Sequence, residues 1–99
     1  MDFRLIYTKL AERDLEEIVR YIARDNTRAA GKIGLRLVEV AESLARFPYQ
    51  GAPLRNREGV RKMLCTPYVI FYRVDETLRT IRVQRFWRAK RDRKEMEEQ

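Results

Sequence analysis

The stretch Tyr68-Val69-Ile70-Phe71-Tyr72-Arg73-Val74-Asp75 largely decides the architecture of this chain of 99 residues. Its first residues are apolar or aromatic at odd and even positions alike, which is typical of a central strand buried on both faces. Thr66-Pro67 separates this strand from a preceding one over residues 60–65, and Asp75-Glu76-Thr77 separates it from a following one over residues 78–86. Connections this short permit antiparallel hairpins and leave no room for a parallel crossover. The sequence therefore predicts a three-strand antiparallel meander.

Upstream of the meander, the sequence predicts one more strand and two helices. Residues 3–7 predict a short aromatic and branched strand, and Thr8 can then cap a helix over residues 9–24. A second helix is expected to begin after Asp25-Asn26-Thr27 and to end before Pro48, since proline disfavours helical geometry in the residue before it. Apolar residues at helical spacing mark the core side of these helices: Ala11, Leu15, Ile18 and Ile22, then Ala30, Ile33, Leu37, Val40, Ala41 and Leu44. We therefore predict an α+β fold with all strands in one sheet and the helical hairpin on one face.

Length and composition exclude several classes of site. Residues 1–99 are expected to form one domain, with residues 95–99 as a frayed acidic tail. The chain has no His and one Cys, which excludes Ser–His and Cys–His nucleophile systems, structural zinc sites and an internal disulfide. No apolar run approaches the roughly 20 residues of a membrane span, and the N-terminus is unlike a signal peptide. We expect a cytoplasmic protein that uses no cofactor and no metal.

The charge of the chain is unevenly distributed. Lys and Arg together number 22 and Asp and Glu 15, which gives a net charge of +7. Residues 51–94 hold 13 of the basic and 4 of the acidic side chains. A localised excess of this kind indicates an anionic partner, whether nucleic acid, an acidic protein or a membrane surface. The alternative is that these cations solvate the surface of a small domain.

Basic residues of the predicted sheet are the candidate contacts to such a partner. Side chains alternate along a strand, so Arg61 and Lys62 are expected on opposite faces, and Arg82 and Arg85 likewise on opposite faces. A subset therefore shares the face that the helices leave uncovered. That face can bind a polyanion, stabilise charge that develops on phosphate during RNA cleavage, or remain merely solvated. The candidates are Arg61, Lys62, Arg82, Arg85, Arg88 and Arg91.

Three apolar residues are candidates for contact with a partner. Trp87 stands among the arginines and can stack a nucleic acid base, anchor a partner protein or close the core. Leu35 and Val38 fall outside the main apolar stripe of the second helix, where they form a second contact face or the margin of a wide core stripe. The residues expected in the core are Tyr68, Tyr72 and Cys65.

The order and spacing of many positions resemble one known family. These positions are Ala11, Asp14-Leu15, Ile18, Tyr21-Ile22, Ala29-Ala30, Leu44, Pro48, Gly51, Gly59-Val60-Arg61 and residues 68–75. Over nearly the whole chain they resemble the RelE/ParE superfamily of bacterial toxins. The resemblance implies the toxin of a type II toxin–antitoxin pair, held inactive by a cognate antitoxin and without a membrane partner. The expected antitoxin contacts are Leu35, Val38 and Trp87.

The two branches of this superfamily differ in target. RelE-like members cleave messenger RNA on the ribosome, whereas ParE-like members inhibit DNA gyrase. Val69 stands where the RelE branch has an arginine, and the ending Arg91-Asp92 looks more ParE-like. We therefore predict a toxin nearer the ParE branch, with a RelE-like endoribonuclease and a non-toxic nucleic-acid-binding module as alternatives. The target contacts would be Arg61, Lys62, Arg82, Arg85, Trp87, Arg88 and Arg91, and an endoribonuclease would use Lys62, Arg85, Arg88 and Arg91 on the phosphate.

Overall fold

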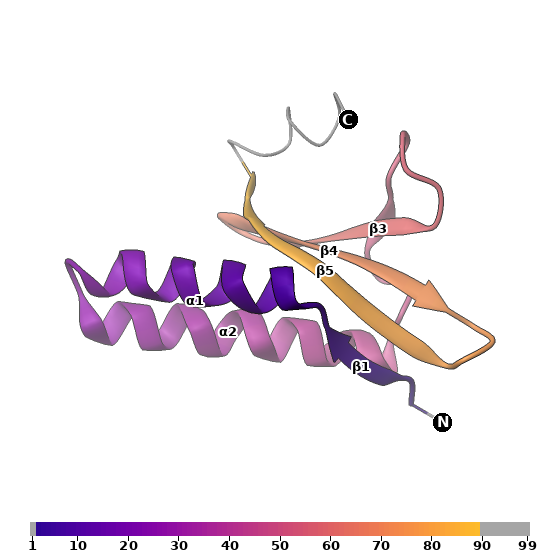
Figure 1. Ribbon diagram of the computed structural model, residues 1–99, viewed down its shortest axis with the longest axis horizontal. Coiled ribbons are helices and arrows are strands. Elements are labelled where there is room, and N and C mark those ends of the chain that lie inside the picture. The colour runs from indigo at the N-terminus through magenta and orange to yellow at the C-terminus, as the bar shows by residue number, and fades with distance from the viewer. Residues whose placement is uncertain (1, 90–99) are drawn as a thin grey trace.

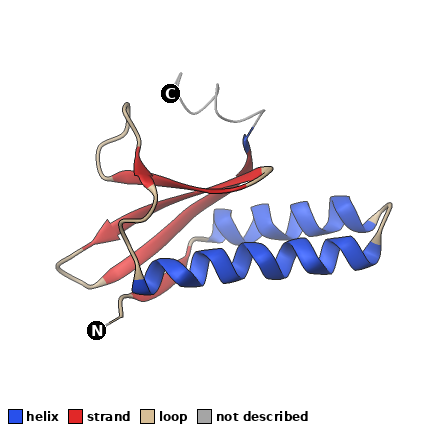
Figure 2. Cartoon of the chain, turned by 180° about the vertical axis from the view of Figure 1, so that it is seen from behind, coloured by secondary structure: helices blue, strands red, loops and turns tan. Residues whose placement is uncertain are grey.

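The computed structural model describes residues 2–89 and consists of two helices packed against one sheet (Figure 1). The elements are β1 (Arg4–Tyr7), α1 (Lys9–Ala23), α2 (Thr27–Arg46), β2 (Ala52–Pro53), β3 (Val60–Cys65), β4 (Tyr68–Asp75) and β5 (Thr80–Arg88). The view from behind shows the helices side by side in one layer and the strands in the other (Figure 2). The predicted α+β class and the helical hairpin are confirmed. The predictions for Arg91 and for residues 95–99 lie outside the described residues.

The strands form one mixed sheet in the order β1-β5-β4-β3-β2. The meander of β3, β4 and β5 is antiparallel as predicted. The N-terminal strand joins it parallel to β5, with Arg4 opposite Thr80, so the sheet as a whole is not purely antiparallel. At the other edge, the two-residue strand β2 pairs with β3 through Ala52 and Lys62. The sequence did not predict β2, because Ala-Pro lies in a turn-rich connector with no strand pattern.

The two helices begin at side-chain caps and approach each other closely. Thr8 Oγ1 accepts a hydrogen bond from the Ala11 amide at 3.0 Å, and Asn26 Oδ1 accepts one from the Ala29 amide at 3.0 Å. At Gly34, an added Cβ would lie 3.0 Å from Val19 Cγ2. The backbone of α2 therefore packs closely against the Val19 side chain of α1 at this position. Neither helix is long and apolar enough to cross a membrane.

The main core lies between the helices and the sheet. Residues of α2 meet one face of β4 and β5 there, and the predicted core positions Tyr68, Tyr72 and Cys65 are buried. The fully buried side chains of this core include Leu37, Leu44, Ile70, Tyr72, Ile81, Val83 and Phe86. Their burial fixes which face of every strand points toward the helices.

The last strand begins at Thr80 rather than at residue 78 as predicted, and it ends at Arg88 rather than at residue 86. The hairpin that precedes it is longer than its sequence suggests, because Asp75 Oδ1 accepts a hydrogen bond from the Leu78 amide at 2.9 Å. Arg79 then adopts a φ of 54° to close the turn. Leu78 consequently lies in the turn, 67% exposed.

A β-bulge in β5 corrects the predicted arrangement of its arginines. Arg85 pairs with Phe71, whereas Val83 pairs with the next residue of β4, which leaves Gln84 as an extra residue. An extra residue shifts the alternation of side chains by one position. Arg82 and Arg85 therefore project from the same face of the sheet, and the prediction that they lie on opposite faces is wrong.

We expect Tyr72→Phe to lower the free energy of unfolding by about 2 kcal/mol. The buried Tyr72 hydroxyl donates to the Pro48 carbonyl at 2.8 Å and accepts from the Gly51 amide at 3.0 Å, so its loss leaves two backbone groups unpaired. Burial also raises the pKa of Tyr72 above 10.0, and that of Tyr7 likewise. Because the folded state holds these protons more tightly, stability is full below pH 10 and falls as the pH rises beyond it.

Urea denaturation at pH 7 and at several values above pH 10 measures both effects. The variant should retain a shallower alkaline decline, because Tyr7 still titrates. A variant that unfolds at the same urea concentration as the wild type at pH 7 would contradict the structural role of the hydroxyl.

Candidate functional site: the open face of the sheet

The sheet face that α1 and α2 leave uncovered, here called the open face, carries the candidate site. Strand register defines it, because residues that alternate with the core positions project away from the helices. Its residues are Arg4 and Ile6 of β1, Val60, Lys62 and Leu64 of β3, Val69, Phe71, Arg73 and Asp75 of β4, and Thr80, Arg82, Arg85 and Trp87 of β5. Three rows in register span the whole meander: Val60–Arg73–Arg82, Lys62–Phe71–Arg85 and Leu64–Val69–Trp87.

One end of the open face is an apolar cluster around Trp87. The Trp87 ring meets Phe71 edge to face, with the ring centroids 5.6 Å apart. The cluster, here called the Trp87 cluster, consists of Val60, Val69, Phe71, Leu54, Trp87 and Ala89. Beside it, Leu64 is 62% exposed. Trp87 thus closes a small second core while part of its surface remains in contact with solvent.

Arg85 on this face is held by Asp14 of α1. Arg85 Nε lies 2.7 Å from Asp14 Oδ2 and Nη2 lies 3.1 Å from Oδ1, and the Phe86 amide donates to the same carboxylate at 3.1 Å. β1 ends at Tyr7, so this half of β5 has no neighbouring strand on that side, and the carboxylate takes the place of one. The guanidinium also lies over the Trp87 ring, 4.4 Å from its centroid. The charge of Arg85 is therefore already paired.

The structure brings Lys62 and Arg82 to the open face together with two arginines that the sequence analysis did not select. Arg73 lies directly opposite Arg82, and Arg4 lies on the neighbouring strand β1. Both could have been found from the sequence, because Arg73 shares the parity of Phe71, and Arg4 alternates with the inward-facing Leu5. Neither arginine belongs to a cluster of basic residues in the sequence, so only the face of its strand marks it as a candidate.

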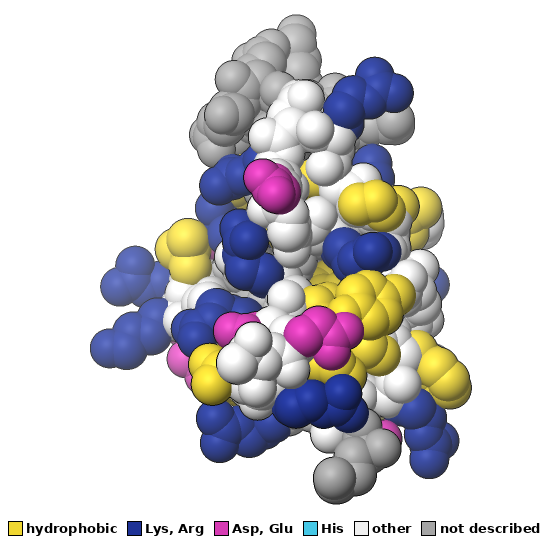
Figure 3. Space-filling view, turned by 90° about the vertical axis from the view of Figure 1, so that its right-hand side faces the viewer, with side chains coloured by type: hydrophobic (Ala, Val, Ile, Leu, Met, Phe, Trp, Pro, Cys, Tyr) yellow, Lys and Arg dark blue, Asp and Glu magenta, His cyan; other side chains and the backbone are white. Residues whose placement is uncertain are grey.

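The remaining candidates lie elsewhere. Arg61 points to the helix side, where its Nη1 donates to the Gly51 carbonyl at 2.6 Å and its guanidinium covers the ring of Tyr49. Arg88 pairs with Tyr68, so its position also belongs to the helix side of β5. Seen from the end of the β4–β5 hairpin, Lys and Arg side chains are scattered over the visible face and along its outline (Figure 3). The predicted cations thus do not form one continuous platform.

The predicted antitoxin contacts lie on two different layers. Leu35 of α2 is 62% exposed and Val38 is half-buried, whereas Trp87 projects from the open face. The Arg36 side chain between the two α2 residues donates to the Thr66 carbonyl at 3.1 Å and ties α2 to the β3–β4 turn. The structure therefore does not bring Leu35 and Val38 into contact with Trp87.

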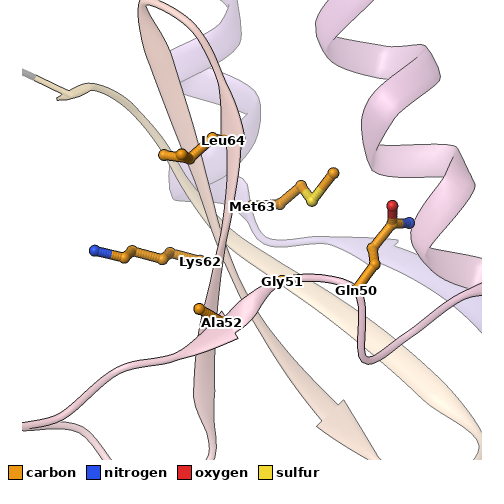
Figure 4. Close-up of a pocket in the computed structure, with 6 residues that line it drawn as sticks. All are labelled: Gln50, Gly51, Ala52, Lys62, Met63 and Leu64. Carbon is orange, nitrogen blue, oxygen red and sulfur yellow. The ribbon is translucent and has the colours of Figure 1, made fainter.

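A shallow pocket of about 270 Å³ lies beside the edge of β3. It is lined by Gln50, Gly51, Ala52, Lys62, Met63 and Leu64. Lys62 and Leu64 point to one side of β3, while Met63 points to the side of Gln50 (Figure 4). Residues 2–89 contain no group of three His, Cys, Asp or Glu side chains that could hold a metal ion. The pocket brings the Lys62 amine and the Gln50 amide together with apolar side chains.

Comparison with known proteins identifies a matching family and a related protein. The family model described as the ParE toxin of the type II toxin–antitoxin system parDE matches residues 5–93. The proposed toxin Y4kP of Sinorhizobium fredii is 32% identical over 81 residues, which cover 81% of this chain and 84% of that protein.

Two solved structures resemble the fold described above. A chain of the chromosomal ParDE system of P. aeruginosa matches with a TM-score of 0.73 and 27% identity, covering 87% of this chain and 95% of that one. A chain of the toxin–antitoxin complex RelBE2 of Mycobacterium tuberculosis matches with a TM-score of 0.67 and 27% identity, covering 89% of this chain and 99% of that one.

Proposed function

The chain belongs to the ParE toxin family of type II toxin–antitoxin systems, and from this membership we propose that it arrests growth by binding DNA gyrase and is neutralised by a cognate antitoxin. The target and the antitoxin are both part of the proposal. The contacts we assign to the target are those of the open face, with Lys62, Arg82 and Trp87 at their centre.

The ion pair of Arg85 with Asp14 is the observation that carries the choice of binding over RNA cleavage. An endoribonuclease needs cations that converge on the scissile phosphate, where they stabilise developing charge. Arg85 is neutralised at 2.7 Å by a carboxylate, and the position of Arg88 belongs to the other side of β5. Of the endoribonuclease candidates among residues 2–89, Lys62 is then left on the open face, opposite the buried side chain of Phe71.

The proposed antitoxin contacts are distributed over both layers of the fold. Leu35 and Val38 offer apolar surface on α2, and Trp87 offers it on the open face. One partner segment can use both only if it is extended enough to pass around the edge of the sheet. The net charge of +7 favours an acidic segment for this role.

The proposal predicts that purified protein inhibits gyrase in a plasmid supercoiling assay and that induced expression arrests bacterial growth. Primer-extension mapping of transcripts after induction should find no new 5′ ends in translated messages. Cuts in those messages with supercoiling untouched would replace the proposal by the RelE-like alternative. Normal growth in the presence of soluble protein would remove the toxin function altogether.

A pair of lysine variants tests the assignment of the open face. Lys62→Gln should raise the concentration needed for half-inhibition of supercoiling several-fold, because it removes a cation next to the Trp87 cluster. Lys32→Gln changes the net charge equally on an exposed turn of α2 and should leave inhibition unchanged. Equal effects of the two variants would contradict the assignment.

A further inference from the structure

We propose that Arg4, Arg73 and Arg82, here called the arginine strip, bind the phosphate backbone of DNA. The proposal deepens the function given above and rests on it for its biological setting, because gyrase holds DNA as its substrate. The toxin would then contact the nucleic acid of the gyrase complex as well as the protein.

The arginine strip crosses three neighbouring strands of the open face. Arg73 of β4 and Arg82 of β5 are direct register partners, and such partners lie on strands about 4.8 Å apart. Arg4 of β1 pairs with Thr80, two residues before Arg82 on the same face. All three arginines are exposed. Arg73 and Arg82 lie in one row across the sheet, and Arg4 lies in the adjacent row of the same face, with Thr80 and Asp75.

The arginine strip works against the stability of the fold. Like charges directly opposite each other on a sheet are destabilising, and Arg73 and Arg82 form such a pair. Two nearby arginines are compensated, since Arg85 is paired with Asp14 and Arg79 with Glu76. Within residues 2–89, no carboxylate lies in ion-pair range of the arginine strip. An uncompensated pair of this kind indicates a ligand that supplies the negative charge.

The surroundings of Arg73 orient its guanidinium. Its Nη1 donates to the Glu58 carbonyl at 3.1 Å, which leaves its other N–H groups for a ligand. Gly59 has a φ of +80°, and a Cβ at this position would collide with Arg73 Nη1. Asp75, the nearest acidic residue along β4, accepts a hydrogen bond from the Leu78 amide. The loop before β3 therefore holds this arginine in place.

The chemistry of the arginine strip favours phosphate over an acidic protein segment. A protein partner needs apolar anchors, but Val60 opposite Arg73 is only 1% exposed and Ile6 is half-buried. The exposed apolar residue of the open face, Leu64, lies two rows away. A planar guanidinium matches phosphate oxygens with two parallel hydrogen bonds, and a row of them matches a repeating anion.

Fluorescence anisotropy with a labelled DNA duplex of about 20 base pairs tests this proposal without gyrase. The test variant is Arg73→Gln with Arg82→Gln. The control is Arg13→Gln with Arg20→Gln, which removes the same charge from exposed positions of α1. We expect the test variant to bind at least tenfold more weakly than the wild type. The slope of log affinity against log salt should fall by about 2, since each phosphate contact contributes about 0.9.

Every other outcome of this experiment decides for or against the DNA site. A wild type that does not bind the duplex, or an equal loss in both variants, overturns the proposal. Stronger, Arg73-dependent binding of a labelled poly-glutamate peptide would replace DNA by an acidic protein as the ligand. DNA binding that depends on the arginine strip, in a protein that fails to inhibit supercoiling, would leave the site standing and refute the gyrase target.

A folding control separates binding from structure. Removal of the Arg73–Arg82 repulsion should leave the melting temperature of the test variant equal to or above that of the wild type. A weaker duplex affinity at unchanged or higher melting temperature is the combined result that supports a ligand site. A variant that melts lower would show that the pair stabilises the fold, and this would contradict the argument from repulsion.

Discussion

Asp14→Ala is expected to lower the free energy of unfolding by about 3 kcal/mol, a large part of the stability of a domain of this size. The carboxylate accepts hydrogen bonds from Arg85 Nε and Nη2 and from the Phe86 amide. The Asp14 side chain is 10% exposed and that of Arg85 28% exposed, so water compensates little of the loss. The substitution leaves a half-buried guanidinium and a backbone amide without their acceptor.

Thermal unfolding measures this effect, which corresponds to a decrease of roughly 10–25 °C in melting temperature. Glu16→Ala, an exposed acidic position on the same helix, is the matched control and should change stability little. Asp14→Leu combined with Arg85→Met should recover part of the loss, because it removes both charges while retaining volume. Equal effects of Asp14→Ala and Glu16→Ala would show that the ion pair does not hold α1 to β5.

Gly51→Ala is expected to destabilise the fold by a similar amount, about 3 kcal/mol. Its added Cβ would lie 2.6 Å from the Lys62 carbonyl oxygen and 2.7 Å from the Tyr72 hydroxyl. Neither atom can move away cheaply, because one belongs to the backbone of β3 and the other is anchored by Pro48. The connector must therefore shift, and the β2–β3 pairing shifts with it.

Gly31→Ala provides the control for this substitution. Nothing lies within 4 Å of a Cβ added at Gly31, an exposed position in α2. Alanine should stabilise the helix there by about 1 kcal/mol through its higher propensity. Denaturation midpoints in urea should therefore move in opposite directions for the two variants. A Gly51→Ala protein as stable as the wild type would contradict the close packing of the connector.

Most of the fold could be predicted because local signals and burial agree. Thr8 and Asn26 cap their helices from the sequence positions that capping chemistry requires, and the apolar stripe of α2 identifies the side that packs on the sheet. β4 could be placed in the sheet interior because it is apolar on both faces. The parallel pairing of β1 with β5 was not predictable in this way, because it depends on packing between the two ends of the chain.

The candidate site was less predictable, because it depends on strand register and on contacts distant in sequence. Asp14 and Arg85 are 71 residues apart. The sequence around neither residue indicates that the two form an ion pair. The predicted faces of Arg82 and Arg85 assumed unbroken alternation, which the extra residue Gln84 interrupts. The sequence predicted only that Arg61 and Lys62 lie on opposite faces of their strand, and the structure places Lys62 on the open face.

Gln84 has a further consequence for the alignment of homologous chains. A homologue that lacks the inserted residue is one residue shorter between Val83 and Arg85, so an alignment without a gap there shifts everything downstream in this strand by one position. That shift would match the homologue's counterpart of the core residue Phe86 to the outward-facing Arg85 of this chain. Positions on the open face should therefore be aligned separately for the two segments of β5. Ile81 is the reference position for the first segment and Phe86 for the second.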